Sequence, residues 1–313
     1  MSGPSETPST AADVPISEPW HKPKVIYVMG AGHSGSTILG VTLGNCEKLF
    51  YSGELEEWLL RSGVAKFGGL ERARFWQSVR EEVDGAEDLF GGEVREALER
   101  SAALLKPGKW RTRRRLRAKY RRVSGDLYRA VAHVAGATHV IDTSHFPLRA
   151  RELQSVEGID LHLVFLVRNP QGVIGSYIKP INRHASGERT LRIITKNIDL
   201  WWTYILAVSV FLRQPADRRL FLRHEDFVAD PEGVVRQILD HVGSTAALPD
   251  FTSLKTGFPI MGNALLWSEE VSLRAKAATP VRGSRITTLL QMPWRPVLSR
   301  MQPVAASAGH EQR

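Results

Sequence analysis

Short apolar runs alternate with longer amphipathic stretches along most of the chain. Four runs are rich in β-branched and aromatic residues, which is typical of buried strands: 24–29, 138–144, 161–167 and 218–222. The third run is nearly continuous in apolar character, as in a strand that is covered on both faces. Patterns that predict helices follow these runs, over 38–44, after Pro170, over 190–212 and over 231–242. Strands that alternate with helices predict a three-layer α/β fold with a mostly parallel sheet and helices on both faces.

The organisation of the chain follows from composition and spacing. We expect residues 1–22, which are rich in proline and serine, to form a disordered leader. Residues 23–300 are expected to form one α/β domain, and residues 301–313 a flexible tail. The stretch between the first two predicted strands is longer than a simple crossover needs, so we assign a helical insertion to about residues 60–135.

Charge and cysteine content narrow the class of protein. The formal net charge is +9, from 42 lysines and arginines against 33 aspartates and glutamates, which favours anionic partners. Cys46 is the single cysteine, so no internal disulfide can form, which fits a reducing compartment. No apolar run reaches the roughly 18–20 residues of a membrane span, and the first residues do not resemble a secretory signal. We therefore expect a cytoplasmic protein.

A glycine-rich loop lies between the first predicted strand and the first predicted helix, with the sequence GAGHSGST over residues 30–37. Glycines allow the backbone to turn sharply, and the free N–H groups at a helix start attract an anion. The loop therefore predicts a phosphate-binding site. Nucleoside triphosphatases carry a lysine directly after the last glycine, where this chain has Ser36, and this difference argues against a kinase or an ATPase.

The sequence Gly-His-Ser-Gly-Ser-Thr in this loop is similar to that of the sulfotransferase family, and above all to its bacterial members. The resemblance implies a P-loop-like fold in which the loop binds the 5′-phosphosulfate of 3′-phosphoadenosine 5′-phosphosulfate (PAPS). The residues carried over by this resemblance are Gly32, His33, Ser34, Gly35, Ser36 and Thr37. His33 stands where the family has lysine or arginine. Its stabilisation of the transition state is therefore expected to depend on pH.

A second anion site is indicated by FLVRNPQGVIGSY, at the end of the third run. In the family, an arginine that ends a strand and a serine eight residues later hold the 3′-phosphate, and here these are Arg168 and Ser176. An arginine fork binds phosphate oxygens with two parallel bonds. A surface ion pair and a plain helix-face serine are the alternatives. The segment FLRHEDF resembles the family's segment near adenine, with His224 in place of a tyrosine.

Two residues compete as the base that takes the proton of the acceptor. His145 follows the second predicted strand, in a segment that resembles the family's Lys-Thr-His-Leu-Pro, whose histidine is the base. Glu54 lies in a segment that resembles bacterial and Golgi-type members, several of which use a glutamate. We prefer Glu54 slightly, with a pKa raised by burial. His145 would then line the site or stabilise the sulfuryl oxygens. No metal is expected, because the ten histidines show no ligand spacing.

These observations predict a sulfotransferase that moves a sulfuryl group from PAPS to a hydroxyl of a carbohydrate, glycolipid or secondary-metabolite acceptor. The alternatives are a P-loop nucleotide kinase or triphosphatase, and a non-catalytic protein that binds nucleotide or polyanion. The basic stretch 106–122, with Trp110, Leu116 and Tyr120 interleaved, predicts either contact with an anionic membrane or polyanionic substrate, or a solvated helix face. We expect no nucleic-acid partner, because no recognition motif accompanies the charge. The oligomeric state is not predicted.

Overall fold

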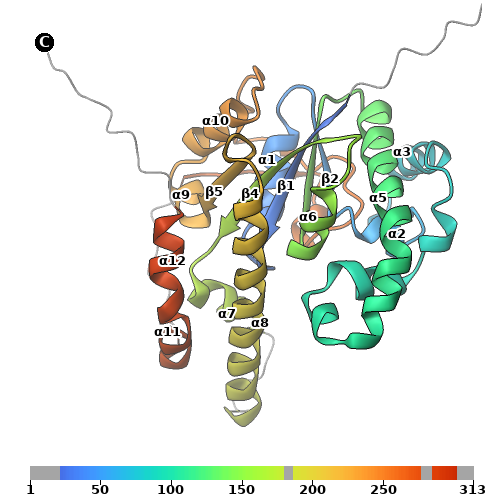
Figure 1. The fold of residues 1–313 in the computed structure, drawn as a ribbon. Helices are drawn as coiled ribbons and strands as arrows, with labels where there is room; N and C mark the ends of the chain where they lie inside the picture. The colour runs from blue at the N-terminus through green and yellow to red at the C-terminus, as the bar shows by residue number, and fades with distance from the viewer. Residues whose placement is uncertain (1–21, 180–185, 276–283, 302–313) are drawn as a thin grey trace, which may run out of the picture.

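The computed structural model describes residues 22–179, 186–275 and 284–301. A five-stranded parallel sheet in the order β2-β3-β1-β4-β5 lies at its centre, with helices on both faces (Figure 1). The strands are β1 (Lys24–Gly30), β2 (Leu49–Gly53), β3 (His139–His145), β4 (Asp160–Val167) and β5 (Arg219–Arg223). The three-layer α/β prediction is confirmed. The expected leader, apart from residue 22, and the expected tail beyond residue 301 lie outside the described residues.

The register of the sheet brings the carboxyl ends of all five strands to one edge. In this register Met29 of β1 lies opposite His145 of β3, and Gly30 lies opposite Leu166 of β4. The chain goes from β1 to β2 and β3 on one side of β1, and then crosses to β4 on the other side. The strand order therefore reverses at β1, and ligands of such sheets bind beyond the carboxyl ends at this point.

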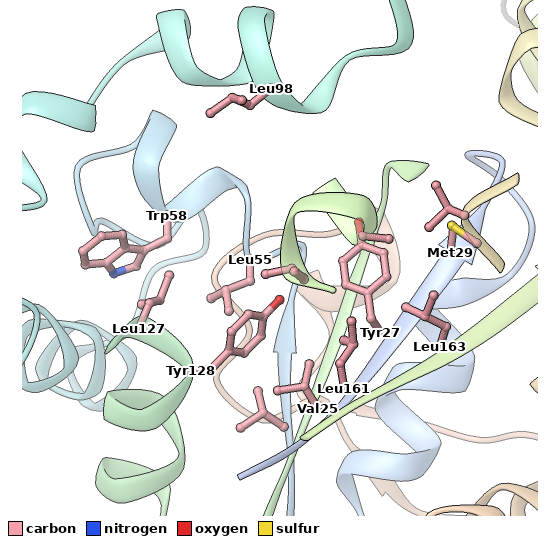
Figure 2. Close-up of a cluster of buried hydrophobic side chains, with 14 of the residues drawn as sticks. Val25, Tyr27, Met29, Leu55, Trp58, Leu98, Leu127, Tyr128, Leu161 and Leu163 are labelled. Atoms are coloured by element: carbon pink, nitrogen blue, oxygen red, sulfur yellow. The ribbon is translucent and has the colours of Figure 1, made fainter. Parts of the chain in front are cut away.

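One face of the sheet carries Val25, Tyr27 and Met29 of β1, which are completely buried. Figure 2 shows these side chains with those of Leu127 and Tyr128 from the long helix of the insertion. The helices that cover this face are α5 (Pro107–Ala135), α6 (Pro147–Leu153) and α8 (Ser186–Arg213). The alternation of side chains along β1 sends Ile26 and Val28 to the opposite face, as expected for a strand that is covered on both sides.

The opposite face is covered by α1 (Ser36–Gly44) and α10 (Pro231–His241). The remaining helices are α2 (Glu57–Leu60), α3 (Leu70–Glu81), α4 (Gly92–Val94), α7 (Pro170–Ile178), α9 (His224–Ala229), α11 (Arg285–Gln291) and α12 (Arg295–Arg300). Short 3-10 or π turns are η1 (Glu87–Leu89), η2 (Arg95–Glu99), η3 (Ser101–Leu105), η4 (Ala216–Arg218), η5 (Ala264–Trp267) and η6 (Met292–Trp294). A two-stranded antiparallel ribbon joins β6 (Leu254–Lys255) to β7 (Glu270–Val271).

The basic stretch 106–122 differs from its prediction, because much of it faces the protein. Three arginines spaced by four residues, Arg113, Arg117 and Arg121, converge on the buried carboxylate of Glu152 in α6, at 2.7, 3.2 and 2.8 Å. Tyr120 is completely buried and Leu116 packs against the core. The expected outward apolar surface is therefore wrong for these two residues. Trp110 is exposed, and contact with a membrane stays a prediction.

Candidate active site

The glycine-rich loop leaves β1 at the edge where the strands end, and α1 begins at Ser36. Gly35, with a φ of 91°, precedes α1, and no side chain caps the helix. The first N–H groups of α1 are therefore left for a ligand, because a helix cannot satisfy them itself. The loop is enclosed on two sides. A Cβ on Gly32 would lie 2.6 Å from Tyr177 Oη, and one on Gly35 would lie 2.3 Å from His224 Nδ1.

Replacing Gly35 by alanine is therefore expected to lower stability by about 1–3 kcal/mol through the clash and by a further ~1 kcal/mol through the left-handed backbone. Thermal unfolding measures the loss. Gly175, within α7, is a matched control, because a Cβ there meets no atom within 4 Å. Adding His224→Ala to Gly35→Ala should restore the stability that is lost through the clash. The loss that is due to the left-handed backbone should remain. A Gly35→Ala variant as stable as the wild type would contradict this packing.

Arg168 lies directly after β4, and its guanidinium contacts the loop. Nη1 donates a hydrogen bond to the backbone oxygen of His33 over 2.9 Å. The guanidinium also lies close to Gly172 in the first turns of α7, where a Cβ would lie 2.8 Å from Arg168 Nε. Ser176 is one turn further along α7, and its hydroxyl donates to the backbone oxygen of Gly172 over 2.9 Å. The two candidate anion sites are thus neighbours at one edge of the sheet.

His224 begins α9, after β5, and its ring lies against Gly35. Burial, and then the charge of Arg168, lowers the pKa of His224. Nδ1 is buried and has no hydrogen-bond partner among the described residues. An unpaired buried nitrogen is costly and marks a place where a ligand can supply the partner. The structure therefore brings His224, Arg168 and the loop together.

His33 projects from the loop with a φ of 62° and is exposed. Its ring packs edge-on against Tyr177, with the two ring centroids 4.5 Å apart. Partial burial, and then the charge of Arg168, lowers the pKa of His33. The neutral imidazole therefore prevails at neutral pH, in contrast to the fixed cation that the resemblance implies at this position. An anion bound in the loop would raise the pKa of His33, because it stabilises the charged imidazolium.

A cavity of about 470 Å³ opens beside the loop. Its lining combines the loop itself with the turn after β3, the insertion and the helices α7 and α8. Among the lining residues are Gly30–Gly32, Leu105, His145, Tyr177, Lys196 and Trp202. The insertion thus contributes a wall of the cavity through η3. A second cavity, of about 380 Å³, lies on the α11 side of Arg168.

His145 is the last residue of β3 and faces this cavity. Its backbone is in the left-handed region, with a φ of 56°. Tyr27 stabilises the turn after β3, because its hydroxyl donates a hydrogen bond to the backbone oxygen of Phe146 over 2.9 Å. Burial lowers the pKa of His145 to about 4, so the imidazole is neutral at pH 7 and can accept a proton.

Glu54 lies one strand further from the loop, directly after β2. Its N–H donates to the backbone oxygen of Met261 over 3.0 Å. Burial raises the pKa of Glu54 to about 7, and the nearby carboxylates of Glu57 and Asp142 contribute to this increase. Among the described residues, Glu54 is not one that lines the cavity next to the loop.

The sequence matches the model of a family described as the sulfotransferase family over residues 23–247. The chain belongs to the sulfotransferase family. The comparison with curated proteins gave no match. The resemblance to the sulfotransferase family is thereby confirmed.

Three solved structures of sulfotransferases are similar to this chain. The sulfotransferase domain from the curacin biosynthetic pathway is 15% identical, with a TM-score of 0.51, over 90% of this chain and 99% of that domain. The sulfotransferase domain of the olefin synthase from Synechococcus PCC 7002 is 18% identical, with a TM-score of 0.49, and the match covers 88% of this chain and 96% of that domain. A sulfotransferase from Mycobacterium tuberculosis H37Rv is 17% identical, with a TM-score of 0.45, and the match covers 72% of this chain and 69% of that protein. The curacin-pathway domain, at 15% identity and a TM-score above 0.5, shows the fold alone.

The sequence analysis did not identify the buried network that supports the site of this sulfotransferase. Asp142 is its centre. One carboxylate oxygen of Asp142 accepts from the N–H groups of Ser144 (2.8 Å) and Leu55 (3.3 Å), and the other accepts from Tyr128 and Arg149. Asp142 thereby ties the end of β3 before His145 to the segment after β2. In the sequence, the position of Asp142 three residues before His145, in the segment DTSH, was the one feature that could have indicated this role.

Arg149 extends this network into the insertion. Its guanidinium donates to Glu99 of η2 over 3.1 Å and to the hydroxyl of Tyr120 in α5 over 2.8 Å. All these groups are buried. The network therefore fixes the insertion, which supplies one wall of the cavity, to the strand that carries His145. Among the described residues, no group of three or more His, Cys, Asp and Glu side chains could hold a metal ion.

Proposed function

We propose that this sulfotransferase moves a sulfuryl group from PAPS to a hydroxyl of an acceptor. One observation carries the proposal. Arg168 donates a hydrogen bond to the backbone of His33 over 2.9 Å, so that a loop suited to one phosphate and an arginine suited to another lie side by side. PAPS carries anionic groups at both its 5′ and 3′ ends, and a single molecule can therefore occupy both sites.

The residues present fit this donor. The uncapped N–H groups of α1, with Gly32–Thr37, would hold the 5′-phosphosulfate. Arg168 and Ser176 would hold the 3′-phosphate, and the unpaired Nδ1 of His224 is placed for a further contact. When bound, PAPS supplies the sulfuryl group and a phosphate leaving group. The loop and His33 would stabilise the charge that develops on the leaving oxygen.

The base is proposed to be His145. Its neutral imidazole lines the cavity that adjoins the loop, where an acceptor hydroxyl has to lie to attack the sulfur of the donor. A base has to reach the proton that it removes, and geometry decides before pKa does. Glu54, which the sequence favoured slightly, has the better-matched pKa but lies outside the lining. It remains the alternative base.

The class of acceptor hydroxyl, whether of a carbohydrate, a glycolipid or a secondary metabolite, and the cytoplasmic location stay predictions. No helix in the described ranges combines the length and apolar character that a bilayer span requires.

Calorimetry with adenosine 3′,5′-bisphosphate and ADP tests the proposal. The bisphosphate should bind at least tenfold more tightly, since charge-assisted bonds to the 3′-phosphate are worth about 1.5–3 kcal/mol. This preference should be lost in Arg168→Ala and partly kept in Arg168→Lys, which retains the charge without the fork. Arg236→Ala is a control, because it changes an exposed arginine of α10 that lines neither cavity. Equal affinity for the two nucleotides in the wild type would refute the donor assignment.

A further inference from the structure

Helix α8 carries an exposed apolar stripe. Its members recur every three or four residues, so that at 100° per residue they share one narrow face of the helix. They are Leu191, Ile194, Ile198, Trp202 and Ile205. Their exposed fractions lie between 37% for Ile194 and 63% for Leu191. Figure 1 shows that the N-terminal half of α8 extends past the strands, on the side where the strands end.

The stripe is continuous with the cavity beside the glycine-rich loop. Ile198 and Trp202 belong to the stripe and also line the cavity. Leu105 of the insertion, 60% exposed, belongs to the same lining. The cavity therefore has a reacting end, at His145 and the loop, and a mouth with large exposed apolar side chains from two elements.

The charged side chains of the lining are already paired, Arg100 with Glu96 of the insertion at 3.5 Å and Lys196 with Asp199. Lys196 forms an ion pair with Asp199 at 2.6 Å, and its ammonium lies 5.0 Å from the centre of the Tyr177 ring. A site that recognises a sugar by its hydroxyls needs polar groups that are free to pair with them. The exposed leucine, isoleucine and tryptophan side chains instead favour an apolar body.

Resting on the sulfuryl transfer proposed above, we propose that the acceptor is an amphipathic alcohol rather than a free sugar. Its hydroxyl lies at His145, and its aliphatic or aromatic body leaves the cavity past Trp202 and follows the stripe of α8. In the reaction the acceptor oxygen forms a bond to sulfur while the bond from sulfur to the phosphate oxygen breaks. The proton of the hydroxyl goes to the imidazole of His145. The products are a sulfate monoester and adenosine 3′,5′-bisphosphate.

A homologous series of primary alcohols, from 1-butanol to 1-decanol at concentrations where they are monomeric, tests the inference with the full chain and PAPS. We expect kcat/KM for the acceptor to rise by about three- to fourfold per methylene, the effect of burying one CH₂ group. Glucose should be a poor acceptor. Ile198→Ser and Trp202→Ser should flatten the dependence on chain length. Leu212→Ser is the matched control, because Leu212 is exposed on the same helix and is not among the lining residues.

Binding of 1-decanol to the chain saturated with adenosine 3′,5′-bisphosphate gives a readout without turnover. Calorimetry should show about tenfold weaker binding in Trp202→Ser and no change in Leu212→Ser. Equal binding in the wild type and Trp202→Ser would overturn the inference, as would glucose turning over as well as decanol. A change of oligomeric state in Ile198→Ser and Trp202→Ser, with the alcohol dependence intact, would assign the stripe to contacts between copies and also overturn it. Failure to bind the bisphosphate would instead refute the donor assignment alone.

Discussion

Replacing His145 by alanine is expected to lower the single-turnover rate of sulfuryl transfer by about 10²–10⁴-fold, the usual contribution of a general base. The imidazole lines the cavity beside the loop and is neutral at pH 7, because burial lowers its pKa to about 4. Binding of adenosine 3′,5′-bisphosphate should be unchanged, since His145 is not among the residues assigned to the donor. Rapid-quench measurement of one turnover, with the chain in excess over PAPS, isolates the chemical step.

Glu54→Gln is the comparison for this prediction. If His145 is the base, removing the charge of Glu54 should slow transfer by much less than removing the imidazole. The opposite order, with Glu54→Gln slow and His145→Ala close to the wild type, would transfer the role to Glu54. If neither change slows the step, neither residue is the base.

The pH dependence provides a second readout of the same prediction. The value of kcat/KM for the donor reports ionisations of the free enzyme. A base with a pKa of about 4, as for His145, is deprotonated at neutral pH and loses activity as the pH falls through about 4. A base with a pKa of about 7, as for Glu54, is half-protonated at neutral pH, and activity then falls already between pH 8 and pH 6. With His145 as the base, no loss of activity is expected from pH 8 down to about pH 5, and protonation of His33 on the acid side would raise the rate within this range.

Most of the sheet could be predicted from the sequence because its strands are short, apolar and bounded by glycine or proline. Four of the five strands were identified, with ends that shift by at most one residue. The missed strand, β2, has five residues at an edge of the sheet, pairs with β3 alone and ends in Ser-Gly. Such a segment has little apolar periodicity of its own, and its pairing depends on a strand some ninety residues away in the chain.

The site was predictable where one local segment carries the chemistry. The loop follows β1, the arginine follows β4 and the histidine ends β3, and parallel strands bring these segments to the same edge. The cavity was not predictable in this way. Its lining comes from the loop, η3, α7 and α8, and Trp202 gave no signal in the sequence, because its exposure depends on how α8 lies against the sheet.

The basic insertion shows why composition alone misleads. A run of arginines with interleaved aromatic residues is compatible with a surface that binds anions. The structure instead uses Arg113 to pair with Glu152, and it buries Tyr120 against Glu99. Whether these side chains face solvent or the protein depends on their partners, Glu152 in α6 and Glu99 in η2, which are distant in sequence. Charge in this region thus fixes the insertion to the domain, and through it the wall of the cavity.

Arg149→Met is accordingly expected to be the most destabilising of these substitutions, by about 3–5 kcal/mol, the cost of removing one partner from a buried ion pair. Its guanidinium is buried between the carboxylates of Glu99 and Asp142, both of which would lose their counter-charge. Thermal unfolding at pH 7 measures the loss. Arg151→Met, an exposed arginine on the same helix, is the control and should change stability by less than about 0.5 kcal/mol. Adding Glu99→Gln to Arg149→Met should restore part of the loss, because it removes one unpaired charge. If Arg149→Met unfolds within a degree or two of the wild type, the network does not fix the insertion to β3, and the cavity wall needs another support.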